Sequence, residues 1–191
     1  MKQARVLTKE EIRKVIKVCE LTRHADRNKL IVHISFLSGM RAIEIANLRV
    51  KDVLTADNQV LDAIALNKTQ TKGNKGQTVY VGKALKKEIT KYFAKFPKLA
   101  ERKEGYLLRT QKGHFTSLTI QHLFKHLYTL ANIPNATSHS GRRSMISALS
   151  EKGVSVRVIQ ELARHSSLQT TQRYIDVSVP KLKGAVDLIG V

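Results

Sequence analysis

The chain of 191 residues has one cysteine, few acidic residues and no long hydrophobic run. The single Cys19 excludes an internal disulfide and is typical of a reducing compartment, and its place on an apolar helical stripe predicts a core position. The longest apolar stretch, residues 30–37, is interrupted by His33 and Ser35 and is too short to span a bilayer. No apolar segment follows the basic start of the chain, so we expect no secretory signal and a cytoplasmic protein.

The shortage of acidic residues leaves a large excess of positive charge. Lys and Arg number 34 against 15 Asp and Glu, which gives a formal net charge of +19 and a pI near 10.3. A compact domain with this charge repels itself unless a polyanion is a regular partner, and nucleic acid is the obvious candidate. Ribosomal and membrane-surface proteins are also basic, so charge alone indicates a class of partner and no chemistry.

Apolar residues recur at helical spacing through most of the chain. The pair Thr8 and Glu11 has the spacing of a capping box, which predicts a helix from there to Cys19. Further helices are expected over residues 26–38, 41–48, 83–96, 117–131 (capped by Ser117), 137–149 and 155–164, with a short one capped by Ser167. Residues 60–66 and 78–81 predict strands around a turn, Lys72-Gly73-Asn74-Lys75-Gly76. The expected fold class is mainly α with a small β-sheet or hairpin, in one domain.

Two segments place phosphate-binding groups at the predicted start of a helix. Gly39 ends one helix and Arg41 opens the next, so the guanidinium lies near free N–H groups that favour an anion. Glu44, one turn later, is placed to hold Arg41, although an ordinary surface pair is the alternative. His139 and Arg142 share one face of a helix start, where the first can move a proton and the second can hold charge. A solvated basic helix start is the alternative for this pair.

A third segment places His165 close to Tyr174, separated by a break and a short helix. The alternative is that Tyr174 is an ordinary half-buried aromatic. The other tyrosines, at positions 80, 92, 106 and 128, lack comparable neighbours and are expected in the core or the sheet. His122 and His126 have the i,i+4 spacing of a metal pair, but no carboxylate or Cys partner is evident nearby, so no metal site is expected.

Taken together, these segments resemble the tyrosine recombinase (phage integrase) family over about residues 8–179. SGMRAIEIANL is similar to the box of the first arginine, KTQTKGNKGQTVYVG to the hairpin of the catalytic lysine, HSGRRS to the His-x-x-Arg box, and ARHSSLQTTQRY to the closing box. Any one of these occurs by chance, whereas four in the family's order are specific. The resemblance implies the tyrosine recombinase catalytic-domain fold.

The resemblance also implies a role for each matched residue. Tyr174 is the nucleophile that forms a 3′-phosphotyrosyl bond with DNA. Arg41, Arg142 and His165 stabilise the phosphate in the transition state, Lys72 protonates the departing 5′-oxygen, His139 accepts or positions the tyrosine proton, and Glu44 supports Arg41. Lys68, Lys75, Arg143, Arg164 and Arg173 are expected to contact DNA, and Lys68 and Lys75 flank the same turn as Lys72. No metal, cofactor or ATP is implied.

The chain departs from the family pattern in two ways. The residue before the closing His is usually Gly, and here it is Arg164. Residues 1–179 match the catalytic domain and 180–191 a C-terminal docking helix, with no N-terminal core-binding domain, as in an excised domain or a natural short recombinase. The expected partners are double-stranded DNA with a specific recombination site and, on that DNA, further copies that form a tetramer from monomers.

The expected function is site-specific DNA recombination by a bacterial or phage-encoded, nucleoid-associated enzyme, for example in the integration of a mobile element. One alternative is strand relaxation of the type IB topoisomerase kind. Another is a non-catalytic DNA-binding or regulatory protein on the same fold, which would have no need for the nucleophile. The sequence identifies neither the DNA site nor the direction of the reaction.

Overall fold

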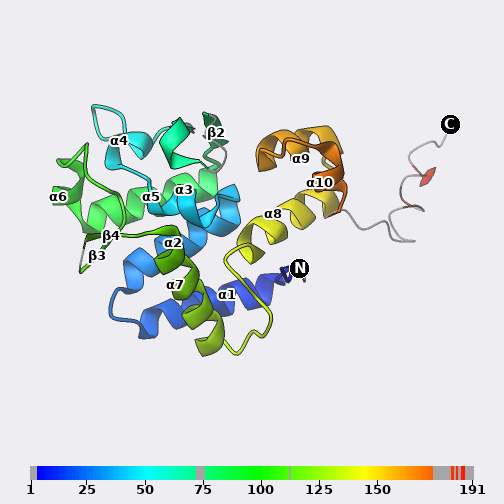
Figure 1. Ribbon diagram of the computed structural model, residues 1–191, viewed down its shortest axis with the longest axis horizontal. Helices are drawn as coiled ribbons and strands as arrows, with labels where there is room; N and C mark the ends of the chain where they lie inside the picture. Colours follow the sequence, from blue (N-terminus) through cyan, green and yellow to red (C-terminus); the bar gives the residue numbers. More distant parts are fainter. Residues whose placement is uncertain are drawn as a thin grey trace. The chain divides into compact units, whose positions relative to one another are not determined.

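The computed structural model describes residues 4–71, 76–111 and 113–173, together with residues 182, 184, 186 and 187 (Figure 1). The chain forms two compact units, residues 1–145 and 146–191, and the boundary falls inside helix α8 (Ser140–Glu151). None of the described helices is long and apolar enough to cross a membrane.

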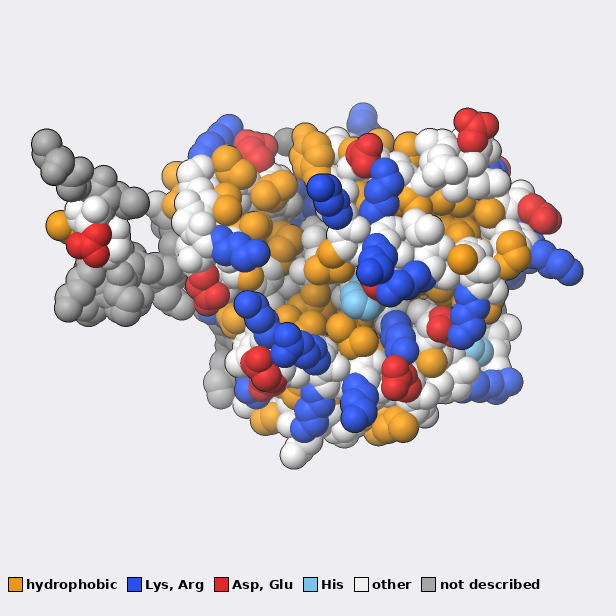
Figure 2. Space-filling model, turned by 180° about the vertical axis from the view of Figure 1, so that it is seen from behind, with side chains coloured by type: hydrophobic (Ala, Val, Ile, Leu, Met, Phe, Trp, Pro, Cys, Tyr) orange, Lys and Arg blue, Asp and Glu red, His pale blue; other side chains and the backbone are white. Residues whose placement is uncertain are grey.

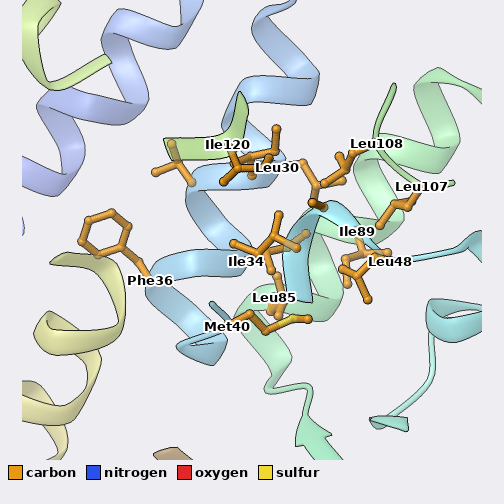
Figure 3. Packing of buried hydrophobic residues seen from close by; sticks show 14 of the residues in the cluster. Leu30, Ile34, Phe36, Met40, Leu48, Leu85, Ile89, Leu107, Leu108 and Ile120 are labelled. Atoms are coloured by element: carbon orange, nitrogen blue, oxygen red, sulfur yellow. The ribbon is translucent and has the colours of Figure 1, made fainter. Parts of the chain in front are cut away.

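The first unit is built from short helices around α2. Its helices are α1 (Lys9–Val18), α2 (Ala25–Ser38), α3 (Ala42–Ala46), α4 (Val50–Val53), α5 (Lys83–Lys95), α6 (Pro97–Ala100) and α7 (Ser117–Leu130), with 3-10 turns η1 (Cys19–Leu21) and η2 (Lys68–Gln70). Helix α2 packs against α5, α3 and α1 (Figure 1). Figure 3 shows how Leu30 and Ile34 of α2 lie beside Leu85 and Ile89 of α5 in the buried core.

Most predicted helices are confirmed, and the differences lie at their ends. The capping box at α1 is formed, because Glu11 N–H donates to Thr8 Oγ1 at 3.2 Å and Thr8 N–H donates to Glu11 Oε2 at 3.0 Å. The prediction that Ser117 caps α7 is wrong. Thr116 is the capping residue, since its side chain accepts from the N–H of Thr119 and Ser117 is already the first helical residue.

Cys19 is fully buried, as its position on the apolar stripe predicted. Burial raises the pKa of its thiol to about 12, so the thiol stays protonated and unreactive at neutral pH. Cys19 is therefore a core residue.

Within the described residues, the strands form two small antiparallel pairs. The two strands predicted within residues 60–66 and 78–81 are confirmed as β1 (Ala63–Leu66) and β2 (Gln77–Tyr80), which pair with Ile64 opposite Val79. A second pair, β3 (Arg109–Thr110) and β4 (Gly113–His114), was not predicted. The turn at residues 72–75 lies outside the described residues.

The second unit contains the end of α8 followed by α9 (Val156–Ala163) and α10 (Leu168–Gln172). Ser155 caps α9, and Ile159 and Thr171 are buried. The predicted cap by the Ser167 side chain is not made, although Ser167 occupies the N-cap position of α10. Most of the predicted docking segment, 180–191, lies outside the described residues.

Candidate active site

Arg41 is held at the start of α3 by a buried carboxylate. It occupies the N-cap position, where its backbone N–H donates to Glu44 Oε2 at 2.8 Å and its Nη1 donates to Glu44 Oε1 at 2.7 Å. The Glu44 side chain is 0% exposed, whereas that of Arg41 is 21% exposed. The pair is therefore not the ordinary surface pair that the sequence left open, since its acid is fully buried and fixes both the backbone and the side chain of Arg41.

Arg142 is brought to the same corner of the fold from the other end of the first unit. It lies on the first turn of α8, is only 6% exposed, and its Nη1 donates to the carbonyl of Gly39 at 2.9 Å. Gly39 ends α2 in the left-handed conformation at φ +63°, two residues before Arg41. The guanidinium of Arg142 is thus within hydrogen-bond distance of the turn that leads into Arg41.

Two glycines make this approach possible. A Cβ on Gly39 would lie 2.7 Å from Met145 Cε, in addition to the strain of its positive φ. A Cβ on Gly141 would overlap the Ser35 hydroxyl and lie 3.0 Å from the Ser35 carbonyl carbon. Gly141, inside the His-x-x-Arg box, therefore lets the start of α8 pack closely against α2, a role that the sequence alone did not reveal.

His139 lies immediately before α8 and is exposed. Its backbone N–H donates to Thr137 Oγ1 at 3.2 Å, and the Thr137 N–H donates to the buried Ser140 Oγ at 3.0 Å. The loop that carries His139 is thereby fixed to the helix start, so His139 and Arg142 lie within one short, well-bonded segment.

Gln70 ties the base of the β1–β2 hairpin to the end of α3, the helix whose N-cap is Arg41. This buried amide donates to the carbonyl of Asn47, which ends α3, at 3.0 Å and to Asp52 Oδ2 at 2.6 Å. Asn67 caps the intervening 3-10 turn, and Lys68 on that turn is exposed. Gln70 was missed by the sequence analysis because a lone amide in a basic stretch carries no recognisable spacing. Lys72 and Lys75 lie outside the described residues.

In the second unit, His165 is fixed by its own neighbours. Its backbone N–H donates to Gln160 O at 3.1 Å, its carbonyl accepts from Gln160 Nε2 at 3.1 Å, and its Nδ1 is 2.9 Å from Thr171 Oγ1. Arg164 ends α9 in the left-handed conformation at φ +54°. Glycine adopts this conformation without strain, so the backbone explains why Gly is usual at this position in the family that the sequence resembles.

The predicted nucleophile, Tyr174, lies outside the described residues, which end at Arg173 in this segment. The other four tyrosines differ in burial and in their contacts. Tyr128 is buried and Tyr92 half-buried, and burial raises the pKa of both phenols, so neither ionises readily. Tyr106 stacks on His114 with ring centroids 4.3 Å apart, and Tyr80 is 64% exposed on β2.

Basic side chains are spread over the surface. Figure 2 shows Lys and Arg side chains across one face, with Asp and Glu side chains among them. Of the predicted DNA contacts, Lys68 and Arg173 are exposed and Arg164 is half-buried. Arg143 is also half-buried, and its Nη1 donates to the carbonyl of Ala4 at 2.8 Å.

No group of three or more His, Cys, Asp or Glu in the described part of the chain is arranged to hold a metal ion. His122 and His126, which have the spacing of a metal pair, are both exposed on α7.

The model of the phage integrase family matches residues 5–180 of this chain. The chain is 34% identical over 185 residues to the tyrosine recombinase XerA of Thermococcus kodakarensis, covering 95% of this chain and 61% of that protein. It is 27% identical over 191 residues to transposase A from transposon Tn554 of Staphylococcus aureus, covering 95% and 51%. The chain thus spans between half and two thirds of the length of these relatives.

Solved structures share the fold. A crystal structure of XerA recombinase aligns with a TM-score of 0.74 at 22% identity over 97% of this chain and 66% of that one. The XerH site-specific recombinase bound to difH substrate in a pre-cleavage complex aligns with a TM-score of 0.73 at 22% identity over 97% and 54%. The predicted mainly helical fold with small antiparallel sheets is therefore confirmed.

Proposed function

The chain belongs to the phage integrase family, and on this premise we propose that it cuts and rejoins DNA at a specific site through a covalent bond to Tyr174. The relatives named above are recombinases and a transposase, and XerH, a site-specific recombinase, was crystallised bound to its difH substrate. We infer that this chain catalyses the same reaction on the same kind of substrate, double-stranded DNA with a recombination site.

The observation that supports the proposal most is the arginine corner of Arg41, Glu44, Gly39 and Arg142. Transfer of a phosphoryl group develops negative charge on the non-bridging oxygens, and donors that are already fixed stabilise this charge without reorganising. Glu44 fixes Arg41 from a fully buried position, and the Gly39 carbonyl fixes Arg142. Two planar guanidiniums held in this way suit a phosphodiester, which each can bind through two donors.

The proposed reaction balances without an external energy source. The Tyr174 oxygen attacks the phosphorus, a P–O bond to tyrosine forms, and the P–O bond to the 5′-oxygen breaks. Lys72 gives the leaving oxygen its proton, and His139 takes or positions the proton of the tyrosine. The phosphotyrosyl bond conserves the energy of the broken phosphodiester, so attack by a 5′-hydroxyl rejoins the strand.

His165 completes the donors to the phosphate. Its Nδ1 is hydrogen-bonded to Thr171, which orients the ring, so His165 acts through Nε2. The two arginines, the lysine and the histidines supply the charge that many nucleases obtain from metal ions.

The protein acts as an assembly in this proposal. Monomers bind DNA and form a tetramer on it, the segment 180–191 docks on a neighbouring copy, and the protein works in the cytoplasm on bacterial or phage DNA. Lys68, Lys75, Arg164 and Arg173 contact the DNA backbone, which makes binding weaken steeply with salt.

Covalent trapping tests the proposal. The wild type, Tyr174→Phe and Tyr80→Phe are incubated without metal on nicked suicide substrates that carry a site already shown to be bound. A denaturing gel is expected to show a protein–DNA adduct for the wild type and for Tyr80→Phe, the matched control on the exposed face of β2, and none for Tyr174→Phe.

An adduct with Tyr174→Phe would show that another residue is the nucleophile. Binding without any adduct would favour a non-catalytic DNA-binding protein, and relaxation of supercoils without recombinants would favour a topoisomerase.

A further inference from the structure

Residues 4–7, which we name the N-terminal strap, are bonded to both sides of the segment that carries His139 and Arg142. Before that segment, the Nη1 of Arg5 donates to the carbonyl of Pro134 at 3.2 Å. After it, the Nη1 of Arg143 donates to the carbonyl of Ala4 at 2.8 Å. In Figure 1 the dark-blue start of the chain accordingly lies beside the start of the yellow helix α8.

Ser144 and Leu7 form a third link. The Leu7 backbone N–H donates to Ser144 Oγ at 2.9 Å, and both residues are buried, at 4% exposure for Leu7 and 5% for Ser144. A buried backbone N–H without a partner would be destabilising, so the Ser144 hydroxyl stabilises the fold by accepting from the Leu7 N–H.

The strap is itself anchored. Arg5 forms an ion pair with Glu11, whose carboxylate also accepts from Thr8 in the capping box of α1. Leu7 belongs to the main hydrophobic core. The strap is therefore a fixed support, and the links to Pro134, Arg143 and Ser144 hold the loop and the helix start against it.

The start of α8 is thus held from two directions. Gly141 packs closely against Ser35 of α2, and Arg143 and Ser144 are bonded to the strap. Arg142 lies between these contacts and is bonded to the Gly39 carbonyl. A displacement of α8 by a fraction of an ångström would move Arg142 relative to Arg41, and displacements near 1 Å reduce catalytic rates by about 100-fold.

We propose that Arg5, Arg143 and Ser144 are positioning residues that hold His139 and Arg142 in place through the strap. This proposal rests on the proposed function, because it assumes that His139 and Arg142 serve catalysis. Arg143, a predicted DNA contact, is in this proposal a support that binds the Ala4 carbonyl.

Salt dependence separates a positioning role from a DNA contact. A residue that neutralises one phosphate contributes about one unit to the slope of log K against log salt concentration. For Arg143→Ala we expect an unchanged slope, a DNA Kd within about twofold of wild type and a single-turnover cleavage rate about 10- to 100-fold lower at saturating DNA. A slope reduced by about one unit with an unchanged cleavage rate would overturn the proposal in favour of a direct DNA contact.

Ser144 tests the strap without any change of charge. Ser144→Ala is expected to lower the cleavage rate at saturating DNA, and Ser144→Thr, which keeps the hydroxyl, to restore most of it. Ile89→Val is the control for general loss of stability, because it removes one methyl group from a fully buried side chain of α5. The control is expected to keep the wild-type cleavage rate. A wild-type rate in Ser144→Ala would overturn the proposal.

A measurement that needs no catalysis separates failure of the strap from failure of the proposed function. The chain has seven histidines, whose ring signals can be observed in ¹H–¹³C spectra. The signal of His139 is identified as the one that is lost in His139→Gln. We expect Arg5→Ala and Ser144→Ala to shift the His139 signal while Ile89→Val leaves it in place. An unmoved His139 signal in both strap variants would overturn the positioning role, even if Tyr174 proved to be the nucleophile. A shifted His139 signal, together with no DNA adduct of the wild type, would support the positioning role of the strap and refute the catalytic role of His139 and Arg142.

Discussion

Glu44 makes the arginine corner unusually sensitive to the loss of one charge. Its fully buried carboxylate accepts from two different donors of Arg41, the backbone N–H at 2.8 Å and Nη1 at 2.7 Å. Glu44→Ala removes both acceptors and leaves the arginine charge without its buried counterion. Breaking a buried ion pair in this way typically destabilises a protein by about 3–5 kcal/mol, a large share of a total stability of about 5–15 kcal/mol.

Glu44→Gln separates charge from shape. Glutamine keeps one acceptor oxygen, so one of the two Arg41 donors must face the amide NH₂, which is itself a donor. We expect a loss of about 1.5–3 kcal/mol in the free energy of unfolding, the usual range for a hydrogen bond to a charged group. Cleavage at saturating DNA should also slow down, because Arg41 is held less firmly.

Urea denaturation followed by far-UV circular dichroism measures the stability change, since the chain has no tryptophan for fluorescence. Glu104→Gln is the matched control. Glu104 pairs with Lys51 but is 72% exposed, so this substitution should change stability by less than about 1 kcal/mol. Equal stability losses in Glu44→Gln and Glu104→Gln, with equal cleavage rates, would refute the role assigned to the buried carboxylate.

Three further substitutions test other parts of the structure. Gly141→Ala should destabilise the fold by about 1–3 kcal/mol through overlap with Ser35, and adding Ser35→Ala should recover part of the loss; strict additivity in urea denaturation would contradict the close contact. Arg164→Gly should be about 1 kcal/mol more stable than Arg164→Ala, because both lack the arginine side chain and only alanine is strained at φ +54°. Equal free energies of unfolding for the two variants would exclude the left-handed backbone at this position. Burial lowers the pKa of His33 below its usual value near 6.5, so the unfolded state binds more protons there and the free energy of unfolding falls as pH drops below about 6.5. His33→Gln should flatten this fall between pH 8 and pH 5, and parallel pH profiles for variant and wild type would show that His33 does not contribute.

The helices were predictable because their signals are local. Thr8 and Glu11 lie within one turn, and the apolar stripe that contains Cys19 follows directly. The strands β3 and β4 were missed because two residues each are too short to show alternation. The Ser117 cap was placed one residue late, since Thr116 and Ser117 are both good capping residues and only the geometry distinguishes them.

The residues of the candidate site were found by spacing and resemblance, but their supports were not. Nothing in the sequence indicates that Arg143 bonds to a carbonyl 139 positions away, or that Gly141 is needed for contact with Ser35. Gln70 was missed for the same reason, because its partners Asn47 and Asp52 are distant in sequence. Local motifs identify groups that carry chemistry, whereas the contacts that hold them come from segments brought together only by folding.

The most direct test of the central claim is to identify the residue that carries the DNA. Trapped wild-type adduct is digested with nuclease and trypsin, and the modified peptide is sequenced by mass spectrometry. Trypsin cuts after Arg173 and Lys181, so we predict a nucleotide 3′-phosphate on Tyr174 in the peptide 174–181, or in 165–181 if the bond beside the adduct resists cleavage. Tyr174 is the only tyrosine in either peptide. A modification on any other residue would contradict the claim that Tyr174 is the nucleophile.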